Sequence, residues 1–248
     1  MKRLALLLFF GLSLAGASCD NDTCNLKDGT LTNSYHPTGS QTLAVSSDRQ
    51  FILSTNATED SISLLRGADL SRLDRIDIGA TPERVAPLGD QFVVSLRGER
   101  AIARVAVTSG KLTVIDRIDT GAEPIGLVTS EDATKVYVAV SQSGLIEERS
   151  GETLELIRSF KIKHEPRWLA LHPSGQTLYV ATAMGGHLVI VDLIGGTTEE
   201  QSLPNISVPV INEDFRPVDR TRRITGDLTV RPNGRQLLVP VLYIDNIN

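Results

Sequence analysis

The sequence has few of the residues that most often carry chemistry or bind rings. Its 248 residues include two cysteines, one tryptophan and four histidines, and aromatic residues make up 4%. So few rings supply poor stacking platforms for sugars, bases or cofactors. The two cysteines form neither a zinc-binding set nor the Cys-x-x-Cys-His motif that attaches haem. With a net charge of −5, the chain has no basic field to attract nucleic acid. The composition therefore predicts no nucleic-acid partner and no cofactor.

A second absence concerns helices and long apolar runs. Beyond the N-terminal segment, no stretch shows a sustained 3.6-residue apolar period with helix caps, so few helices are expected. The one long apolar run, residues 4–14, is too short to span a bilayer. Lys2 and Arg3 precede it, and the small residues 15–18 follow it. This order is typical of a secretory signal, so residues 1–18 are predicted to be a signal peptide and the protein to be exported.

Cys19 follows the small residues, and here the segment resembles a bacterial lipoprotein signal, in which the cysteine becomes the lipidated first residue after cleavage. Such signals usually carry Leu three positions before the cysteine, where this chain has Gly16. A disulfide between Cys19 and Cys24 is the alternative, because an exported chain meets an oxidising compartment. Residues 19–37 are expected to be a lipid-anchored tether. The resemblance implies a periplasmic or cell-surface protein that contacts a bacterial membrane only through this anchor.

An internal repeat dominates the rest of the chain. Residues 74–82 (DRIDIGATP) recur 42 residues later as residues 116–124 (DRIDTGAEP), with seven identities in nine. Pro166 lies a further 42 residues beyond Pro124. Chance does not account for such agreement, and a fixed period of this length is typical of arrays of small structural units.

Each unit contains the same order of pieces. A short apolar run follows the proline, and then comes a polar turn of residue types that tolerate unusual backbone angles, such as Pro173-Ser174-Gly175. A β-branched and aromatic run is next, and two further strand-like runs complete the unit. Four short strands per unit is the count of a propeller blade, and stacked blades cover one another's faces around an axis. We therefore predict an all-β fold, a β-propeller of four-stranded blades of about 42 residues each.

Several short motifs recur within this period. They are GATP and GAEP at residues 79–82 and 121–124, HPSG at 172–175, LYVA at 178–181 and IVD at 190–192. On these motifs the chain resembles the YVTN family of β-propeller repeats, well over about residues 40–193 and partly over 224–240. The resemblance implies a fold shared with bacterial surface-layer, lactonase-like and cytochrome-associated propellers. Because one fold hosts many activities, it implies no particular activity.

The propeller is expected over residues 38–248, as four blades and the start of a fifth. The period breaks at about residues 194–223, because the turn that begins at residue 172 returns at residue 231, after 59 residues instead of 42. About 17 residues are thus inserted, and long loops of this kind are often functional. A closed ring of seven blades needs on the order of 290 residues. The chain is therefore expected to be a truncated fragment or, alternatively, a small ring of four or five blades.

The inserted segment is rich in arginine. Its candidate binding residues are Arg216, Arg220, Arg222, Arg223 and, close behind, Asp227. Guanidinium groups form bidentate hydrogen bonds with carboxylates and phosphates, so these residues suggest a site for a small anionic ligand or a partner protein. The competing interpretation is a solvated loop whose arginines pair with its own carboxylates.

No catalytic residue and no metal site is expected. His36, His164, His172 and His187 show neither a Ser-His-Asp arrangement nor a two-histidine metal spacing. The predicted function is an envelope-anchored propeller scaffold that binds a protein partner or ligand through the loops of one face. The alternative is an enzyme, either a lactonase-like hydrolase or the propeller of a periplasmic redox protein whose haem domain lies beyond residue 248.

Overall fold

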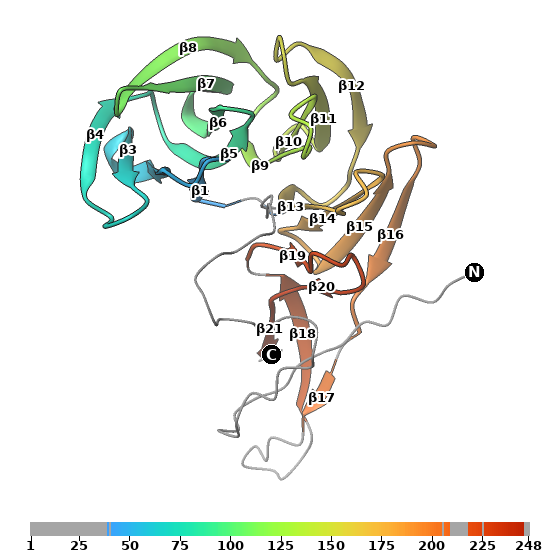
Figure 1. The fold of residues 1–248 in the computed structure, drawn as a ribbon. Helices are drawn as coiled ribbons and strands as arrows, with labels where there is room; N and C mark the ends of the chain where they lie inside the picture. Colours follow the sequence, from blue (N-terminus) through green and yellow to red (C-terminus); the bar gives the residue numbers. More distant parts are fainter. Residues whose placement is uncertain (1–38, 40, 205, 209–217, 225, 246–248) are drawn as a thin grey trace.

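The computed structural model describes residues 39, 41–204, 206–208, 218–224 and 226–245 (Figure 1). These residues form antiparallel sheets and two single-turn 3₁₀ helices, η1 (Ala57–Glu59) and η2 (Arg97–Glu99). No helix in the described ranges is long and apolar enough to cross a membrane. The expected signal peptide, Cys19 and the tether over residues 19–37 lie outside the described residues.

Four sheets of four strands follow one another along the chain, each with its strands in sequence order. Blade one holds β1 (Leu43–Val45), β2 (Phe51–Asn56), β3 (Ser61–Arg66) and β4 (Arg72–Asp77). Blade two holds β5 (Pro82–Leu88), β6 (Gln91–Leu96), β7 (Ala101–Thr108) and β8 (Lys111–Asp119). Blade three holds β9 (Pro124–Thr129), β10 (Lys135–Val140), β11 (Leu145–Ser150) and β12 (Leu156–Lys161). Blade four holds β13 (Pro166–Leu171), β14 (Thr177–Thr182), β15 (His187–Asp192) and β16 (Thr198–Ser202). The predicted all-β fold of four-stranded blades is confirmed.

The blades are arranged around a common axis. Their first strands face the middle and contact one another, β5 with β1 and β9, and β9 with β13. Their fourth strands, β4, β8, β12 and β16, run along the outside (Figure 1). The segment before β1 lies against the first strands, since Gly39 bridges to Ala170 and Gln41 bridges to Val85.

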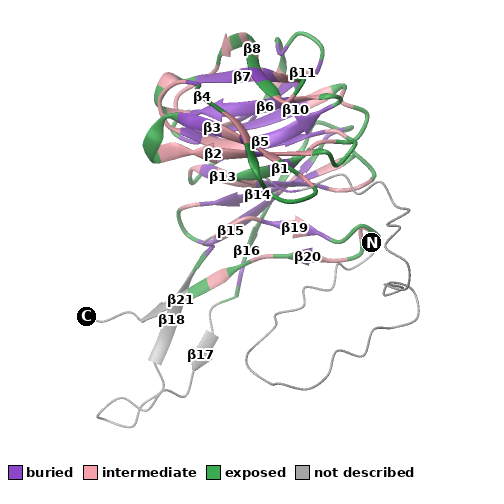
Figure 2. Cartoon of the chain, turned by 60° about the vertical axis from the view of Figure 1, so that its left-hand side comes forward, coloured by how far each residue is buried: buried purple, intermediate pink, exposed green. Residues whose placement is uncertain are grey.

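The apolar core lies between the blades. Each of four buried clusters joins one blade to the next, for example Leu64 with Val94, Ile102 with Leu127, Ile146 with Leu169, and Tyr179 with Leu228. Figure 2 shows these buried strands stacked inside the molecule. A twisted sheet with two apolar faces gains stability only when both faces are covered, at roughly 1.5–3 kcal/mol for each large aliphatic side chain removed from water. Stacking therefore stabilises every blade through its neighbours.

Each connection from one blade to the next contains a left-handed residue at the same place. Thr81, Glu123 and Glu165, each directly before the proline that opens a first strand, have φ of 54°, 57° and 55°. This left-handed conformation is uncommon for residues other than glycine. Its recurrence at one place in the repeat shows that packing of the blades, and not the local side chain, imposes this conformation.

The regular pattern ends after β16. The strand β16 lies within the range that the spacing assigns to an insertion, and it pairs with β15 as the outer strand of blade four. Beyond it, β17 (Ile206–Val208), β18 (Val218–Ile224) and β21 (Val241–Asp245) form a separate sheet that projects from the stacked blades (Figure 1). The short pair β19 (Thr229–Val230) and β20 (Leu237–Leu238) covers the free face of blade four.

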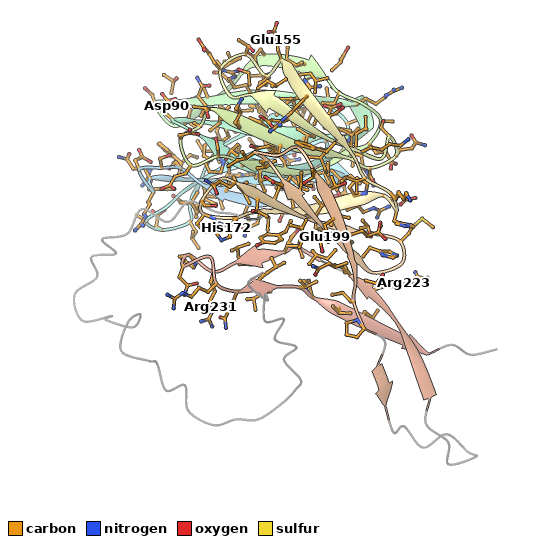
Figure 3. The ribbon with its side chains drawn as sticks, turned by 90° about the vertical axis from the view of Figure 1, so that its right-hand side faces the viewer. Asp90, Glu155, His172, Glu199, Arg223 and Arg231 are labelled. Carbon is orange, nitrogen blue, oxygen red and sulfur yellow. The ribbon has the colours of Figure 1, made fainter. Side chains whose placement is uncertain are left out.

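The alternating strand directions give the molecule two faces. The turn face carries the turns that join first to second strands, such as 130–133 and 172–175, and those that join third to fourth strands. The connection face carries the turns between second and third strands and the links between blades, such as 163–165. Figure 3 shows Asp90, His172 and Arg231 of the turn face on one side and Arg223 on the other.

Candidate functional sites

The predicted arginine set is not gathered into one described cluster. Arg216 lies outside the described residues. Arg220 and Arg222 belong to β18, but only their backbone is described, and Arg223 is exposed at the end of that strand. Asp227 lies elsewhere, next to the first strand of blade two.

Asp227 forms an ion pair that serves the fold. Its carboxylate lies 3.2 Å from the guanidinium of Arg84, whose side chain is 13% exposed. Burial raises the pKa of Asp227, and the nearby Arg84 charge offsets part of that shift. The pair links β5 of blade two to the segment before β19.

A groove on the turn face is a candidate binding site. It has a volume of about 770 Å³ and lies between the turns of blades three and four, with Pro232 of the β19–β20 turn at its edge. Its walls combine apolar and charged side chains, among them Tyr137, Glu148, Arg158, His172, Leu193 and Ile194. Sites for small molecules in proteins have volumes of roughly 300–1,000 Å³, so the groove has the size of a binding site.

The floor of the groove is a network of charged side chains that form ion pairs with one another. The carboxylate of Glu148 is buried, 2.7 Å from Arg158 and 3.4 Å from Lys135. Arg158 also donates to the backbone carbonyl of Leu193 and lies over the ring of Phe160, 4.9 Å from its centroid. Burial, reinforced by the Glu148 charge, raises the pKa of Tyr137 far above its usual range.

The lip of the groove is apolar and held in place. Ile194 is 70% exposed, in the turn between β15 and β16. The backbone N–H groups of Gly195 and Ile194 donate to Asp192 Oδ1 at 3.0 and 2.9 Å. These two hydrogen bonds lower the pKa of Asp192. The turn that presents Ile194 is thus closed by a carboxylate cap.

On the connection face, the structure brings together two histidines that are far apart in sequence. The rings of His164 and His187 are stacked, with centroids 4.5 Å apart. Glu200 Oε1 lies 2.8 Å from His187 Nδ1 and 3.8 Å from His164 Nε2. His172 lies apart, in the groove, with its ring nitrogens near Ser174 and the carbonyl of Gly234. His36 lies outside the described residues.

Comparison with known proteins identifies the architecture. No protein-family model matches the sequence. Over 174 residues the chain is 27% identical to the uncharacterized protein YncE of Salmonella typhi, an alignment that covers 65% of this chain and 46% of that protein. The chain thus spans about half the length of this relative.

Two solved structures are similar over most of the chain. Hydrazine synthase of Kuenenia stuttgartiensis superposes with a TM-score of 0.61 and 18% identity, covering 89% of this chain and 66% of that one. The periplasmic gluconolactonase PpgL of Pseudomonas aeruginosa superposes with a TM-score of 0.62 and 15% identity, covering 81% and 64%. The fold is a β-propeller. At such identities the likeness extends to the fold alone, and the resemblance to YVTN repeats and to a lipoprotein signal stays a prediction.

Two sites of this propeller were missed by reasoning from sequence. The groove is built from turns about 42 residues apart, and each of them looks like an ordinary turn in the sequence. The His164–His187–Glu200 cluster combines residues from a link, a third strand and a fourth strand. An alignment of the units offers a sequence signal, because His164 stands where the preceding links have Ala80 and Ala122.

Proposed function

We propose that this propeller is a non-catalytic binding scaffold, exported and anchored to the cell envelope, that holds a partner protein in the groove between blades three and four. The observation that carries the proposal is the groove itself, a cavity of about 770 Å³ with an exposed isoleucine at its lip. The lipoprotein-like start of the sequence, with Cys19 after the small residues, supports the envelope location.

The apolar lip favours a partner protein. Ile194 exposes most of its side chain beside Leu193, Pro173 and Pro232, which also line the groove. A capped turn presents this surface, so little conformational entropy is lost when it is covered. An apolar anchor surrounded by polar groups is the usual composition of a protein-binding surface.

The charged floor favours specificity over catalysis. Glu148 already contacts two cations, so its charge is compensated without a ligand. Tyr137 keeps its proton at neutral pH, because burial and the Glu148 charge both raise its pKa. Tyr137 is therefore not set to accept a proton from a substrate. A partner that places a polar group over this floor gains orientation from the fixed charges.

Site-specific photo-crosslinking in the host cell tests the proposal. A photo-reactive phenylalanine analogue placed at residue 194 is expected to yield a discrete adduct with one partner protein. The same analogue at residue 115 is the matched control, because Ile115 is also exposed, at 52%, but lies on β8 of blade two. In the identified pair, Ile194→Asp is expected to weaken binding about tenfold or more. Equal adducts at both positions, or an unchanged affinity for Ile194→Asp, would overturn the proposal.

The hydrolase alternative has its own measurement. The similarity to a gluconolactonase extends to the fold, so the direct assay is hydrolysis of glucono-δ-lactone by the purified chain. We expect the rate of the buffer alone. Turnover above that rate that is abolished by Glu148→Gln would replace the scaffold by an enzyme with its site in the same groove. The redox alternative requires covalently bound haem in the natural gene product, which haem staining detects.

A further inference from the structure

The corner where a link meets the following blade is held by different side chains in different blades. In blade two, the link residue Ala80 donates its backbone N–H to Glu99 Oε1 in the turn before β7, at 3.0 Å. The same Glu99 forms an ion pair with Arg117 of the outer strand β8. Blade one repeats the pair, with Glu59 lying 2.6 Å from Arg75. An acid in the turn and an arginine on the outer strand therefore close this corner in two blades.

Blade four replaces every member of this corner. Pairing of the strands makes Glu200 the counterpart of Arg117, because Arg117 pairs with Ala103 on β7 and Glu200 pairs with Val189 on β15. Gly185 takes the place of Glu99, and His164, 42 residues after Ala122, takes the place of the link alanine. His187 opens β15. In blade four the carboxylate, that of Glu200, is therefore on the outer strand, and the imidazoles of His164 and His187 lie next to it.

The three side chains are close enough to share one ion. Each offers one ligand atom, and the three atoms all lie within 4.8 Å of one another. Ligands about 2.0–2.1 Å from a tetrahedral zinc lie roughly 3.3 Å apart, so the Glu200–His187 distance of 2.8 Å would lengthen slightly and the Glu200–His164 distance of 3.8 Å would shorten slightly. The glycine at residue 185 leaves room for this, because a Cβ there would meet the His187 ring.

We propose that His164, His187 and Glu200 form a binding site for a divalent transition-metal ion, with Zn²⁺ the best fit and water in the fourth position. Two imidazole nitrogens and one carboxylate oxygen suit zinc, whereas calcium and magnesium take oxygen ligands. The two rings lie 12° from parallel, so the His164 ring turns about χ2 to direct its nitrogen at the same point as His187 Nδ1. The inference is independent of the proposed function, because the groove lies on the other face.

Such an ion would take over the role of the arginine–glutamate pair. It would join the connection between blades three and four, which carries His164, to β15 and β16 of blade four. His164 has a left-handed backbone, with φ of 64°, and is followed by Glu165 with φ of 55°. A ligand that binds only the folded corner shifts the equilibrium toward the folded state, so the loaded protein is expected to unfold at a higher temperature.

Metal titration of the full chain tests the site. Competition with a chromophoric chelator is expected to show one Zn²⁺ per chain that is lost from His187→Ala and weakened more than about tenfold in His164→Ala and Glu200→Gln. His172→Ala is the matched histidine control and is expected to retain affinity. Cobalt(II) serves as a spectroscopic probe, because thiolate ligation by Cys19 or Cys24 gives charge-transfer bands that histidine and carboxylate do not.

A second measurement keeps the test decisive. Zn²⁺ is expected to raise the melting temperature of the wild type and of His172→Ala, but not that of Glu200→Gln, a variant that keeps a polar group beside His187. Zinc affinity that is unchanged in all three site variants, or thiolate bands in the cobalt spectrum of the wild type, would overturn the proposal.

Discussion

Blades two and four share one backbone plan and differ in the side chains that tie them to their neighbours. In both, the second strand pairs with the third in the same register, from Phe92 with Val105 in blade two and from Leu178 with Val191 in blade four. Phe92 and Leu178 occupy the same place and both are buried. The interiors are therefore equivalent, whereas the corner of blade two is an ion pair and that of blade four is a histidine cluster.

A second difference lies where the blades meet. The hydroxyl of Ser95 accepts a hydrogen bond from the backbone N–H of Arg84 and donates one to the carbonyl of Ile125 in blade three, both at 3.0 Å. Blade four has Ala181 at this place, fully buried. The comparison teaches that the repeat specifies strands and interior apolar residues, and that polar ties between blades are exchangeable additions.

The largest expected effect tests whether the two interiors are equivalent. Phe92→Ala should lower the free energy of unfolding by about 3–5 kcal/mol and Leu178→Ala by about 2–5 kcal/mol, because each leaves a cavity in a core between blades. Denaturant titration followed by circular dichroism measures both, and Ile115→Ala, which alters an exposed side chain, is the control. A negligible cost for Leu178→Ala beside a large one for Phe92→Ala would break the equivalence.

An intermediate effect is expected for the polar tie of Ser95, which blade two has and blade four lacks. Ser95→Ala leaves a buried N–H and a buried carbonyl short of one partner, which should cost about 1–3 kcal/mol. Thr108→Ala removes an exposed hydroxyl from the same blade and should change stability by less than about 0.5 kcal/mol. The same titration compares them, and equal values for the two variants would show that the hydroxyl of Ser95 does not join the blades.

The smallest effect concerns pH and the turn that presents Ile194. Because hydrogen bonds lower the pKa of Asp192 in the folded protein, its stabilising effect is present above the unfolded pKa of about 3.9 and is lost as pH falls through the lower folded value. Melting temperatures between pH 2 and 7 should therefore converge for the wild type and Asp192→Asn only under acidic conditions. A difference that stays constant down to the lowest pH would mean that the charge of Asp192 does not support the turn.

Much of the fold could be predicted because its signals are local. The four strands of each blade follow from apolar runs such as residues 136–138 and 178–180, and the turns follow from residue types that tolerate left-handed angles. The left-handed backbone of Thr81, Glu123 and Glu165 in the links between blades does not follow from these residue types. Packing between blades overrides the local preference there.

The candidate sites could be predicted only in part. The arginine-rich segment stood out in the sequence, yet Asp227 pairs with Arg84 and Arg223 lies away from the groove. The spacing of the histidines in the sequence matches no metal motif, so it predicts no metal site. His164 and His187 are 23 residues apart, and Glu200 follows 13 residues later, so no short pattern contains them.

The sequence by itself determined the unit of this protein: a strand order repeated every 42 residues, with apolar residues on both faces of each sheet. The tertiary structure alone decided which side chains meet, because the groove and the histidine cluster each join segments from different strands or blades. The physical reason is that the 42-residue period reflects the apolar residues through which each sheet packs against its neighbours. A site depends on register across strands and on the stacking of neighbouring blades, which arise only when the sheets pack together.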